Sequence, residues 1–466
     1  MVFPVVGGDG KPTGYEIENS ARFDNTGGDA LGGTFGTATN EKKFTLSMWH
    51  KKSSGTTSGG QVLFGARSGY ENIFLHEETM RMDWNNASSG TINWAPFIRD
   101  HSAWYHFVLA QDTTQSTNSN RIKFYINGRQ ITTLRSGVTA TYPSQNLATG
   151  YNVNGQPFYV SSYNGSAAEI NGYLANVQFV DGQQYDPTYF GKFDDNGVWI
   201  PVEPGTGAGG TVDYGNNGFL LEFKQTGTGT DANGIGADTS GNDNHLAVTN
   251  LTSGNITVDT PTNNFATGNP LAKYINDTNV TYSEGNVKGV AEAVATSYQF
   301  LGNFGLGQGK WYWEVKATDV NQNNDTRIGV VPEESIVGIT INGEHNQIVY
   351  RGDGSVTSTG ESSLSSQGNI TDGMIVGVAL DMDNFTVKWY LNGTLTSTIS
   401  INSTYRNTNY FPFFRHVNSG TVEFNFGNPS FSISSGNTDA NGYGNFEYAP
   451  PSGYYALCTK NLAEYG

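Results

Sequence analysis

The acidic residues of the chain are not spaced for cleavage of a glycosidic bond. That reaction needs two carboxyl groups that flank the scissile bond, and on one face of a β-strand they would recur at every second position. Glu77 and Glu78 are adjacent, so their side chains would point to opposite faces, and Glu314 has no acidic neighbour in its aromatic segment. The serine and histidine residues also lack a G-x-S-x-G turn or another triad context. We therefore expect a protein that is not an enzyme.

The segment Asp238–Asn244 (DTSGNDN) is the strongest candidate for a cation site. Calcium takes six to eight oxygen ligands, and this turn-rich loop offers Asp238, Asn242, Asp243 and Asn244. Aspartate and asparagine also favour turns in the absence of any ion. The sequence therefore leaves two interpretations open, a calcium site and a solvated turn cluster, and no other cofactor is expected. Cys458 is the single cysteine, which excludes an intrachain disulfide and a cysteine-based metal cluster.

Three aromatic residues in polar surroundings are candidates for stacking on sugars. Tyr70, Trp84 and Trp94 lie among polar neighbours, and an exposed aromatic ring suits the C–H face of a sugar. Packing in the core or between subunits is the alternative for each of them. The tripeptide Arg351-Gly352-Asp353 matches an integrin-binding motif, but a hairpin turn between Tyr350 and Gly354 accounts for it.

Glycine and uncharged polar residues replace charge in this chain. Of 466 residues, 60 are glycine, 14% are charged and 13% are aromatic. The aromatic content argues against disorder, and no heptad or Gly-X-Y period indicates coiled coil or collagen. No apolar run approaches the roughly 20 residues that span a membrane, and the opening MVFPVVGGDG does not have the pattern of a signal peptide. The net charge of −17 disfavours nucleic acid and anionic membranes as partners.

Short alternating segments rich in Val, Ile, Thr and aromatic residues indicate β-strands throughout the chain. Two of them lead into Asn-Gly, namely Arg121–Gln130 (RIKFYINGRQ) and Thr386–Leu395 (TVKWYLNGTL). Asn-Gly supplies both positive φ values of a type I′ turn, so each segment predicts a hairpin in a sandwich of its own. Between them, Pro201–Asn269 is rich in Gly, Thr, Asn and Asp. Its one strand-like run, Gly218–Phe223, is expected to return to the first sandwich.

Four segments of the second half occur in a recognisable order, Gly309–Val315 (GKWYWEV), Asp372–Asp383 (DGMIVGVALDMD), the hairpin FTVKWYLNG, and Thr421–Gly427 (TVEFNFG). In this order they resemble the hallmarks of the SPRY (B30.2-type) domain. The resemblance covers roughly Ser283–Phe431 and implies a concanavalin-like sandwich.

Segments of the first half resemble a laminin-G-like (LamG, concanavalin-type) sandwich, namely Ser20–Asp24, Phe44–Trp49, Trp104–Ala110, Arg121–Gly128 and Gly172–Val180. Further segments resemble virion proteins of tailed bacteriophages, especially fibre- and spike-like ones, namely Asp181–Phe190, Gly236–Asn250, Val258–Asn269 and Pro450–Leu462. Together these resemblances imply an all-β chain of two antiparallel concanavalin-like β-sandwiches of the jelly-roll type. The expected parts are a LamG-like sandwich (1–225), a loop-rich connection (226–275), a SPRY-like sandwich (276–435) and a C-terminal segment (436–466).

The resemblance implies a non-enzymatic structural protein of a phage virion, a tail fibre or spike-like protein that binds host surface glycans. It would be assembled in the host cytoplasm, displayed on the particle surface and in contact with other virion proteins. A homo-oligomer is expected, with a trimer favoured, and neither nucleic acid binding nor membrane insertion is expected. The alternatives are a capsid decoration or head fibre protein, a polysaccharide-degrading tailspike, and a cellular secreted lectin or adhesin.

Overall fold

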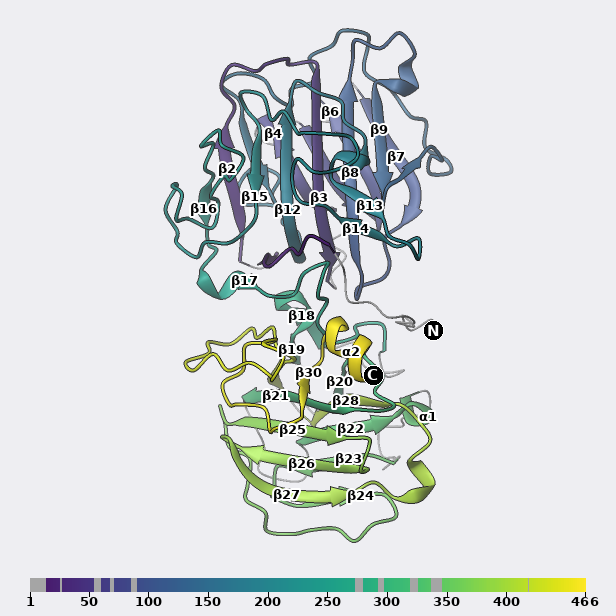
Figure 1. The fold of residues 1–466 in the computed structure, drawn as a ribbon, viewed down its shortest axis with the longest axis vertical. Helices are drawn as coiled ribbons and strands as arrows, with labels where there is room; N and C mark the ends of the chain where they lie inside the picture. Colours follow the sequence, from purple (N-terminus) through teal and green to yellow (C-terminus); the bar gives the residue numbers. More distant parts are fainter. Residues whose placement is uncertain are drawn as a thin grey trace. The chain divides into compact units, whose positions relative to one another are not determined.

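The computed structural model describes residues 14–25, 27–53, 60–67, 71–84, 90–272, 280–291, 297–318, 326–336, 346–417 and 419–466. This part of the chain divides into two compact units, which lie within Pro12–Thr262 and Asn263–Gly466. Each unit contains two mainly antiparallel sheets around a hydrophobic core (Figure 1). The predicted all-β class with two antiparallel sandwiches is therefore confirmed.

The first sheet of the first unit contains β1 (Ser20–Phe23), β3 (Lys43–Lys52), β8 (Trp104–Asp112), β9 (Ile122–Ile126), β10 (Arg129–Ile131), β12 (Gly172–Asp181), β15 (Phe219–Leu221) and β17 (Ile256–Thr257). They are ordered β10-β9-β8-β3-β12-β1-β17, and β15 pairs with β12. The second sheet contains β2 (Ala30–Thr34), β4 (Gln61–Ala66), β5 (Glu71–His76), β6 (Thr79–Trp84), β7 (Gly90–Phe97), β11 (Pro157–Val160) and β16 (Ala247–Thr249). Their order is β16-β2-β11-β4-β5-β6-β7.

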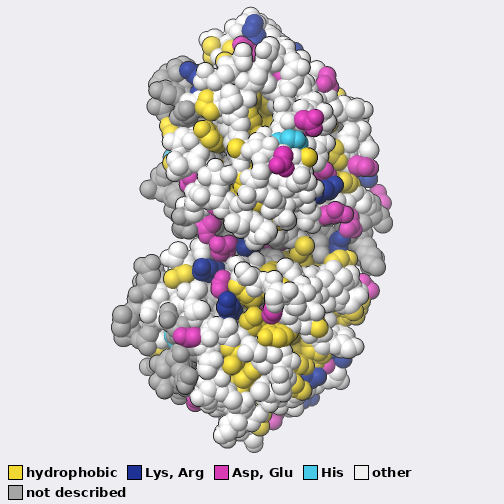
Figure 2. All heavy atoms as spheres, turned by 90° about the vertical axis from the view of Figure 1, so that its left-hand side faces the viewer, with side chains coloured by type: hydrophobic (Ala, Val, Ile, Leu, Met, Phe, Trp, Pro, Cys, Tyr) yellow, Lys and Arg dark blue, Asp and Glu magenta, His cyan; other side chains and the backbone are white. Residues whose placement is uncertain are grey.

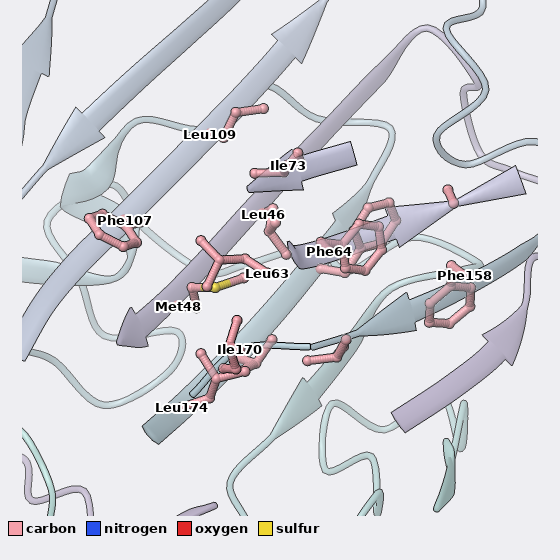
Figure 3. Close-up of a cluster of buried hydrophobic side chains, with 14 of the residues drawn as sticks. Leu46, Met48, Leu63, Phe64, Ile73, Phe107, Leu109, Phe158, Ile170 and Leu174 are labelled. Carbon is pink, nitrogen blue, oxygen red and sulfur yellow. The ribbon is translucent and has the colours of Figure 1, made fainter. Parts of the chain in front are cut away.

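Alternation along the strands builds the core of the first unit. Figure 3 shows Leu46 and Met48 of β3, Leu63 of β4, Ile73 of β5 and Leu109 of β8 gathered in this core. Because successive side chains of a strand point to opposite faces, every second side chain of β3 points to the outer face of the sheet. Burial of each such aliphatic side chain contributes roughly 1.5–3 kcal/mol, so the two sheets are held together mainly by these contacts.

The outer face of the first sheet carries a further layer of chain. This layer includes the 3-10 helix η3 (Pro187–Tyr189) and the hairpin of β13 (Gly191–Phe193) with β14 (Trp199–Pro201). Trp199 packs there with Trp49 and Ala175, and Phe190 packs with Val108. The outer face of this sheet is therefore packed with protein over these strands.

The segment between the predicted sandwiches belongs mostly to the first unit. The run Gly218–Phe223 does return to the first sandwich, where β15 pairs with β12. Residues 226–262 continue on the same unit, because β16 pairs with β2 and β17 pairs with β1. The fully buried ion pair of Lys51 Nζ with Asp259 Oδ2, at 2.7 Å, fixes the end of this segment. The boundary between the units therefore lies at Thr262, whereas the sequence placed a separate connection at 226–275.

The first sheet of the second unit contains β18 (Val280–Ser283), β19 (Lys288–Ala291), β21 (Lys310–Thr318), β25 (Ile375–Asp381), β26 (Thr386–Leu391), β27 (Thr394–Ser400), β29 (Gly420–Asn425) and β30 (Tyr455–Ala456). The order is β18-β19-β29-β21-β25-β26-β27, and β30 pairs with β21. The second sheet contains β20 (Ser297–Leu301), β22 (Arg327–Pro332), β23 (Ile348–Arg351), β24 (Val356–Ser358) and β28 (Tyr410–Val417), ordered β20-β28-β22-β23-β24. Two helices, α1 (Glu333–Ile336) and α2 (Thr459–Tyr465), accompany these sheets.

Three tryptophans form the centre of the second core. Trp311, Trp313 and Trp389 are fully buried between the sheets. The indole N–H of Trp389 donates to the carbonyl of Ile328 at 2.9 Å, so the ring joins the two sheets with its polar atom satisfied. The aromatic strands that carry the SPRY resemblance are therefore the core strands of this unit.

Both predicted type I′ hairpins are present. Asn127 and Gly128 have φ values of 47° and 75°, and Asn392 and Gly393 have 45° and 78°. A left-handed conformation at both central residues defines this turn, and asparagine and glycine adopt it at the lowest cost. The turns set the registers of β9 with β10 and of β26 with β27.

Residues 436–466, which we call the C-terminal strap, complete the second unit. The strap lies over the sheet that contains β21 and β25, as its yellow trace shows in Figure 1. Its strand β30 pairs in parallel with β21, and α2 ends it. Phe446, Tyr454 and Ala456 of the strap are buried against Tyr312 and Ala379 of the sheet. None of the helices in the described ranges has the length and apolar character needed to cross a membrane.

Candidate functional site

The predicted sugar-stacking tryptophans lie in the core of the first unit. Trp84 and Trp94 are only 1% and 3% exposed, and the Trp94 ring lies 5.0 Å from that of Phe124. The polar neighbours that suggested exposure, such as Asp83 and Asn93, point to the opposite face of their strands. The prediction of exposed rings is therefore wrong for both tryptophans. Tyr70 lies outside the described residues.

The loop around Asp238 is a hydrogen-bonded turn and does not fit a calcium ion. The two oxygens of Asp238 accept four hydrogen bonds, from the amides of Leu220, Ser240 and Asn244 and from the Ser240 hydroxyl. Asn242 and Asn244 both donate their amide nitrogens to the carbonyl of Gly218. The Asp243 side chain is 88% exposed. A calcium ion would have to displace the N–H groups that hold Asp238, so the four residues do not form a ligand set.

The Arg351-Gly352-Asp353 tripeptide forms a turn at the end of β23. Arg351 is only 9% exposed and pairs with Arg327 in the sheet. Asp353 accepts hydrogen bonds from the amide and hydroxyl of Ser355. The predicted hairpin turn is therefore observed, and the tripeptide does not form a protruding loop.

A serine and a histidine that lie close together in the first unit do not form a nucleophile pair. Ser47 Oγ lies 2.9 Å from His106 Nε2, and Trp199 Nε1 donates to His106 Nδ1 at 3.0 Å. Since Nδ1 accepts this bond, the ring proton is on Nε2, which donates to the serine and cannot take its proton. Burial lowers the pKa of His106 to about 3. These residues hold the outer layer of the first unit in place.

The second unit contains an open hollow of about 250 Å³. It is lined by Gln308, Gly309, Lys310, Asp383, Gly453, Tyr455 and Tyr465. Three parts of the chain meet there: the start of β21, the turn between β25 and β26, and the C-terminal strap. Within the described residues this hollow brings together aromatic, acidic, basic and amide side chains, and we take it as the candidate site.

Two stacked tyrosines form one wall of the hollow. The rings of Tyr455 and Tyr465 are 3.9 Å apart between centroids and 8° from parallel. The hydrogen bond with Tyr465 raises the pKa of Tyr455 to about 12, and burial contributes to the shift. Both side chains are half-buried. The pair therefore offers a ring surface with hydroxyl groups at its edge.

The charged groups of the hollow come from one ion pair and one exposed carboxylate. Lys310 Nζ lies 3.4 Å from Asp381 Oδ2, and Asp383 Oδ1 accepts the Gly309 amide at 3.0 Å. Burial alone would raise the pKa of Asp381, but hydrogen bonds from Asn384 and the Lys310 ammonium lower it below its ordinary value. Asp381 is thus charged at neutral pH. The hollow offers hydrogen-bond donors and acceptors to a ligand that carries many hydroxyl groups.

The geometry of the hollow does not support hydrolysis by two carboxylates. Asp381 ends β25 and Asp383 lies in the turn that follows it. Asp381 is 4% exposed and held by Lys310 and Asn384. Asp383 is the one acidic side chain that lines the hollow. A glycosidase needs an acidic group on each side of the bond it cleaves. Among the described residues, no group of three or more His, Cys, Asp or Glu side chains converges on a metal position either.

Sequence reasoning missed this site because its residues are scattered. Lys310 and Asp383 fall inside the segments that carry the SPRY resemblance, but nothing in those segments marks them as neighbours. Tyr455 and Tyr465 lie in the C-terminal segment, for which the sequence indicated no role. No sequence pattern marks them as neighbours, because Tyr455 lies in β30 and Tyr465 is the last residue of the short helix α2. Only the docking of the strap brings them to the sheet.

A family model described as "SPRY domain" matches residues 310–429. This match lies within the region where the sequence predicted a SPRY-like sandwich and confirms that part of the prediction. Lys310 and Asp383 of the hollow fall inside the matched range, whereas Gln308, Gly309 and the strap residues fall outside it. The site therefore combines the matched range with segments that lie outside it.

Solved structures similar to this chain include several SPRY domains. The SPRY domain of human HERC1 is 17% identical, with 34% of this chain and 96% of that chain covered and a TM-score of 0.28. The TRIM65 PSpry domain is 14% identical, with 34% and 91% covered and a TM-score of 0.25. The stonustoxin structure is 18% identical, with 34% and 27% covered and a TM-score of 0.26. No curated protein sequence matches this chain.

Proposed function

Because residues 310–429 form a SPRY domain, we propose that this chain is a non-enzymatic binding protein whose second unit holds the ligand. SPRY domains generally act as binding modules. The ligand would occupy the hollow of Lys310, Asp383, Tyr455 and Tyr465. Rigid sheets with a binding site formed by connecting segments are the usual design of such modules.

The chemistry of the hollow supports a neutral carbohydrate as ligand. The stacked pair of Tyr455 and Tyr465 offers a ring for the C–H face of a sugar. Asp383, Lys310 and Gln308 supply an acceptor, an ammonium donor and an amide at its rim. A hydroxyl-rich ligand can satisfy groups of both kinds. An acidic sugar would meet Asp383 as well as the carboxylate of Asp381, so neutral sugars are favoured.

The surface composition is consistent with a neutral ligand. Figure 2 shows a face on which Lys, Arg, Asp and Glu side chains are sparse and of mixed sign among backbone atoms, uncharged side chains and some hydrophobic side chains. The whole chain carries a net charge of −17, with 14% charged residues. Such a surface neither attracts polyanions nor depends on charge for specificity.

The proposed setting is the surface of a bacteriophage particle. The resemblance of the first half to LamG-like sandwiches, and of several segments to phage fibre and spike proteins, supports this proposal. In that setting the chain is a homo-oligomer, with a trimer favoured, that contacts other virion proteins and displays the hollow toward host surface glycans. Immunolabelling of purified particles tests the setting independently of the ligand, because a chain absent from particles rules it out.

Glycan-array binding of the full chain tests the ligand. Asp383→Asn is expected to weaken binding to neutral glycans about tenfold, since a charged hydrogen bond contributes about 1.5–3 kcal/mol. Asp353→Asn is the matched control, because Asp353 is also an exposed turn aspartate but lies outside the hollow. Equal binding by both variants would contradict the proposed site. Release of reducing ends from a bound polysaccharide would contradict the non-enzymatic role.

A further inference from the structure

The hollow of the second unit is shared between the sheet and the strap. Gly453, Tyr455 and Tyr465 belong to the strap, whereas Lys310 and Asp383 belong to β21 and to the turn after β25. Removing the strap from the sheet would remove the aromatic wall and leave only the polar rim. The site as described therefore exists only while the strap is docked.

The strap is joined to the sheet where β29 stops. β29 pairs with β21 from Glu314 to Thr318, and β30 of the strap pairs with β21 at Trp311 and Tyr312. Phe446 of the strap packs edge-on against Tyr312, with ring centroids 5.3 Å apart. Glu314 thus lies at the point where the strap replaces β29 as the neighbour of β21.

The carboxylate of Glu314 links the strap to the sheet. Its Oε2 accepts the Glu447 amide at 3.0 Å and Asn425 Nδ2 at 2.9 Å. Its Oε1 accepts the Tyr448 amide at 2.8 Å and the Tyr312 hydroxyl at 3.3 Å. Glu314 is fully buried. Two of its four donors are backbone amides of the strap, and they reach the carboxylate only in the docked state.

The burial of the Glu314 carboxylate increases the free-energy cost of losing its hydrogen bonds from the strap. Burial raises the pKa of Glu314, while the hydrogen bonds from Tyr448, Glu447 and Asn425 act in the opposite direction. Losing hydrogen-bond donors costs a buried carboxylate far more free energy than it costs an exposed carboxylate. The docked strap therefore both covers the carboxylate and supplies half of its hydrogen bonds.

We propose that Glu314 is a positioning residue for the hollow: its carboxylate docks the strap, and the docked strap completes the binding site. This inference rests on the proposed function, because it concerns how the same site is assembled. Ligand binding and strap docking then stabilise each other, since a ligand that binds only the docked state shifts the equilibrium toward it. Glu314 does not line the hollow and acts through Tyr455 and Tyr465.

Hydrogen exchange of the full chain tests the docking role. In Glu314→Gln, the amides of Asn445 and Thr459 are expected to exchange about tenfold faster or more, in line with losing hydrogen bonds to a charged group. Neither amide contacts Glu314, because they donate to the carbonyls of Gly427 and Asn264, which lie outside the strap. Faster exchange there reports opening of the whole strap. Exchange in β28 serves as the check that the variant remains folded.

Glu423→Gln is the matched control. Glu423 lies on β29 of the same sheet and accepts a hydrogen bond from the Ser430 hydroxyl, outside the strap. Its substitution is expected to leave the exchange of the Asn445 and Thr459 amides unchanged. The docking role is overturned if both variants exchange alike at these amides.

The coupling between strap docking and ligand binding is measured with galactose and N-acetylglucosamine as probes. Either sugar, where it binds, is expected to slow strap exchange in the unsubstituted chain by the factor one plus its concentration over its Kd. A sugar that binds but leaves strap exchange unchanged overturns the coupling. If no neutral sugar binds, the proposed function fails, and so does the coupling that rests on it. The comparison of Glu314→Gln with Glu423→Gln still decides the docking role separately.

Discussion

The rings of Tyr455 and Tyr465 stack in parallel at 3.9 Å, although Tyr455 lies in β30 and Tyr465 lies ten positions later, at the end of α2. Each ring covers one face of the other, so the pair acts as one rigid aromatic wall. The hollow that it borders also contains Lys310 and Asp383, which come from distant parts of the chain. An aromatic wall beside mixed polar groups is suited to a ligand with both C–H and hydroxyl surface.

Substitution of Tyr465 is expected to weaken glycan binding. Tyr465→Ala removes one ring of the wall and should lower affinity about tenfold, because aromatic contacts of this kind contribute about 0.5–1.5 kcal/mol beyond area burial. Leu395→Ala is the control, since Leu395 is 51% exposed on the same unit but lies outside the hollow. Isothermal titration with a glycan identified on the array measures both. Equal affinities would show that the wall does not contact the ligand.

Substitution of Trp84 is expected to reduce stability and to leave binding unchanged. Trp84 is 1% exposed in the core of the first unit. Trp84→Ala should cost about 3–5 kcal/mol of unfolding free energy, through lost burial and the cavity that remains. Urea unfolding measures the cost, and glycan binding under folding conditions provides the second readout. Unchanged stability together with lost binding would restore the surface role that the sequence suggested.

The loop around Asp238 is expected to be insensitive to calcium. Calcium or a chelator should leave the melting temperature unchanged, because hydrogen bonds from protein groups occupy the carboxylate oxygens. Asp238→Ala should destabilise the first unit by about 2 kcal/mol or more, with or without calcium, since it orphans three backbone amides. Differential scanning fluorimetry gives both values. A rise in melting temperature on calcium addition that Asp238→Ala abolishes would contradict this view.

The first unit is expected to lose stability as the pH falls below 6.5. Burial lowers the pKa of His50 and of His106 to about 3, against 6.5 in the unfolded chain. The unfolded state therefore binds these protons first, and each histidine should reduce stability by about 1.4 kcal/mol per pH unit between pH 6.5 and about pH 3. His106→Gln removes one titrating group and should lower the slope by that amount. Hydrogen exchange of β3 and β8 across this range measures the slope, and equal slopes for the two proteins would refute the assignment.

Local turn chemistry made part of the fold predictable. Asn-Gly at Asn127 and Asn392 predicted two hairpins, and both turns have the required left-handed geometry. Strand alternation indicated two antiparallel sandwiches, and the motif order of the second half indicated the SPRY domain that the family model matches. These features depend on residues that are close together in the sequence, so they can be predicted from one sequence.

The candidate site depended on contacts that no local pattern encodes. Polar neighbours made Trp84 look exposed, but alternation in β6 sends those neighbours to the other face. The turn-forming residues around Asp238 satisfy one another and have no capacity left for an ion. Glu314 looked isolated in its aromatic strand, and only the docked strap shows why a carboxylate is buried there. Contacts between residues far apart in the sequence therefore determine the features of the site that the sequence did not predict.

The position of a bound glycan on the full chain shows directly whether the hollow of the second unit is the binding site. A neutral glycan identified on the array, carrying a photoreactive group, can be crosslinked to the protein and its attachment mapped by mass spectrometry. We expect crosslinks to peptides that contain Lys310, Asp383 and Tyr455–Tyr465, and excess unmodified glycan should suppress them. Suppressible crosslinks confined to the first unit would contradict the claim that the hollow of the second unit is the binding site.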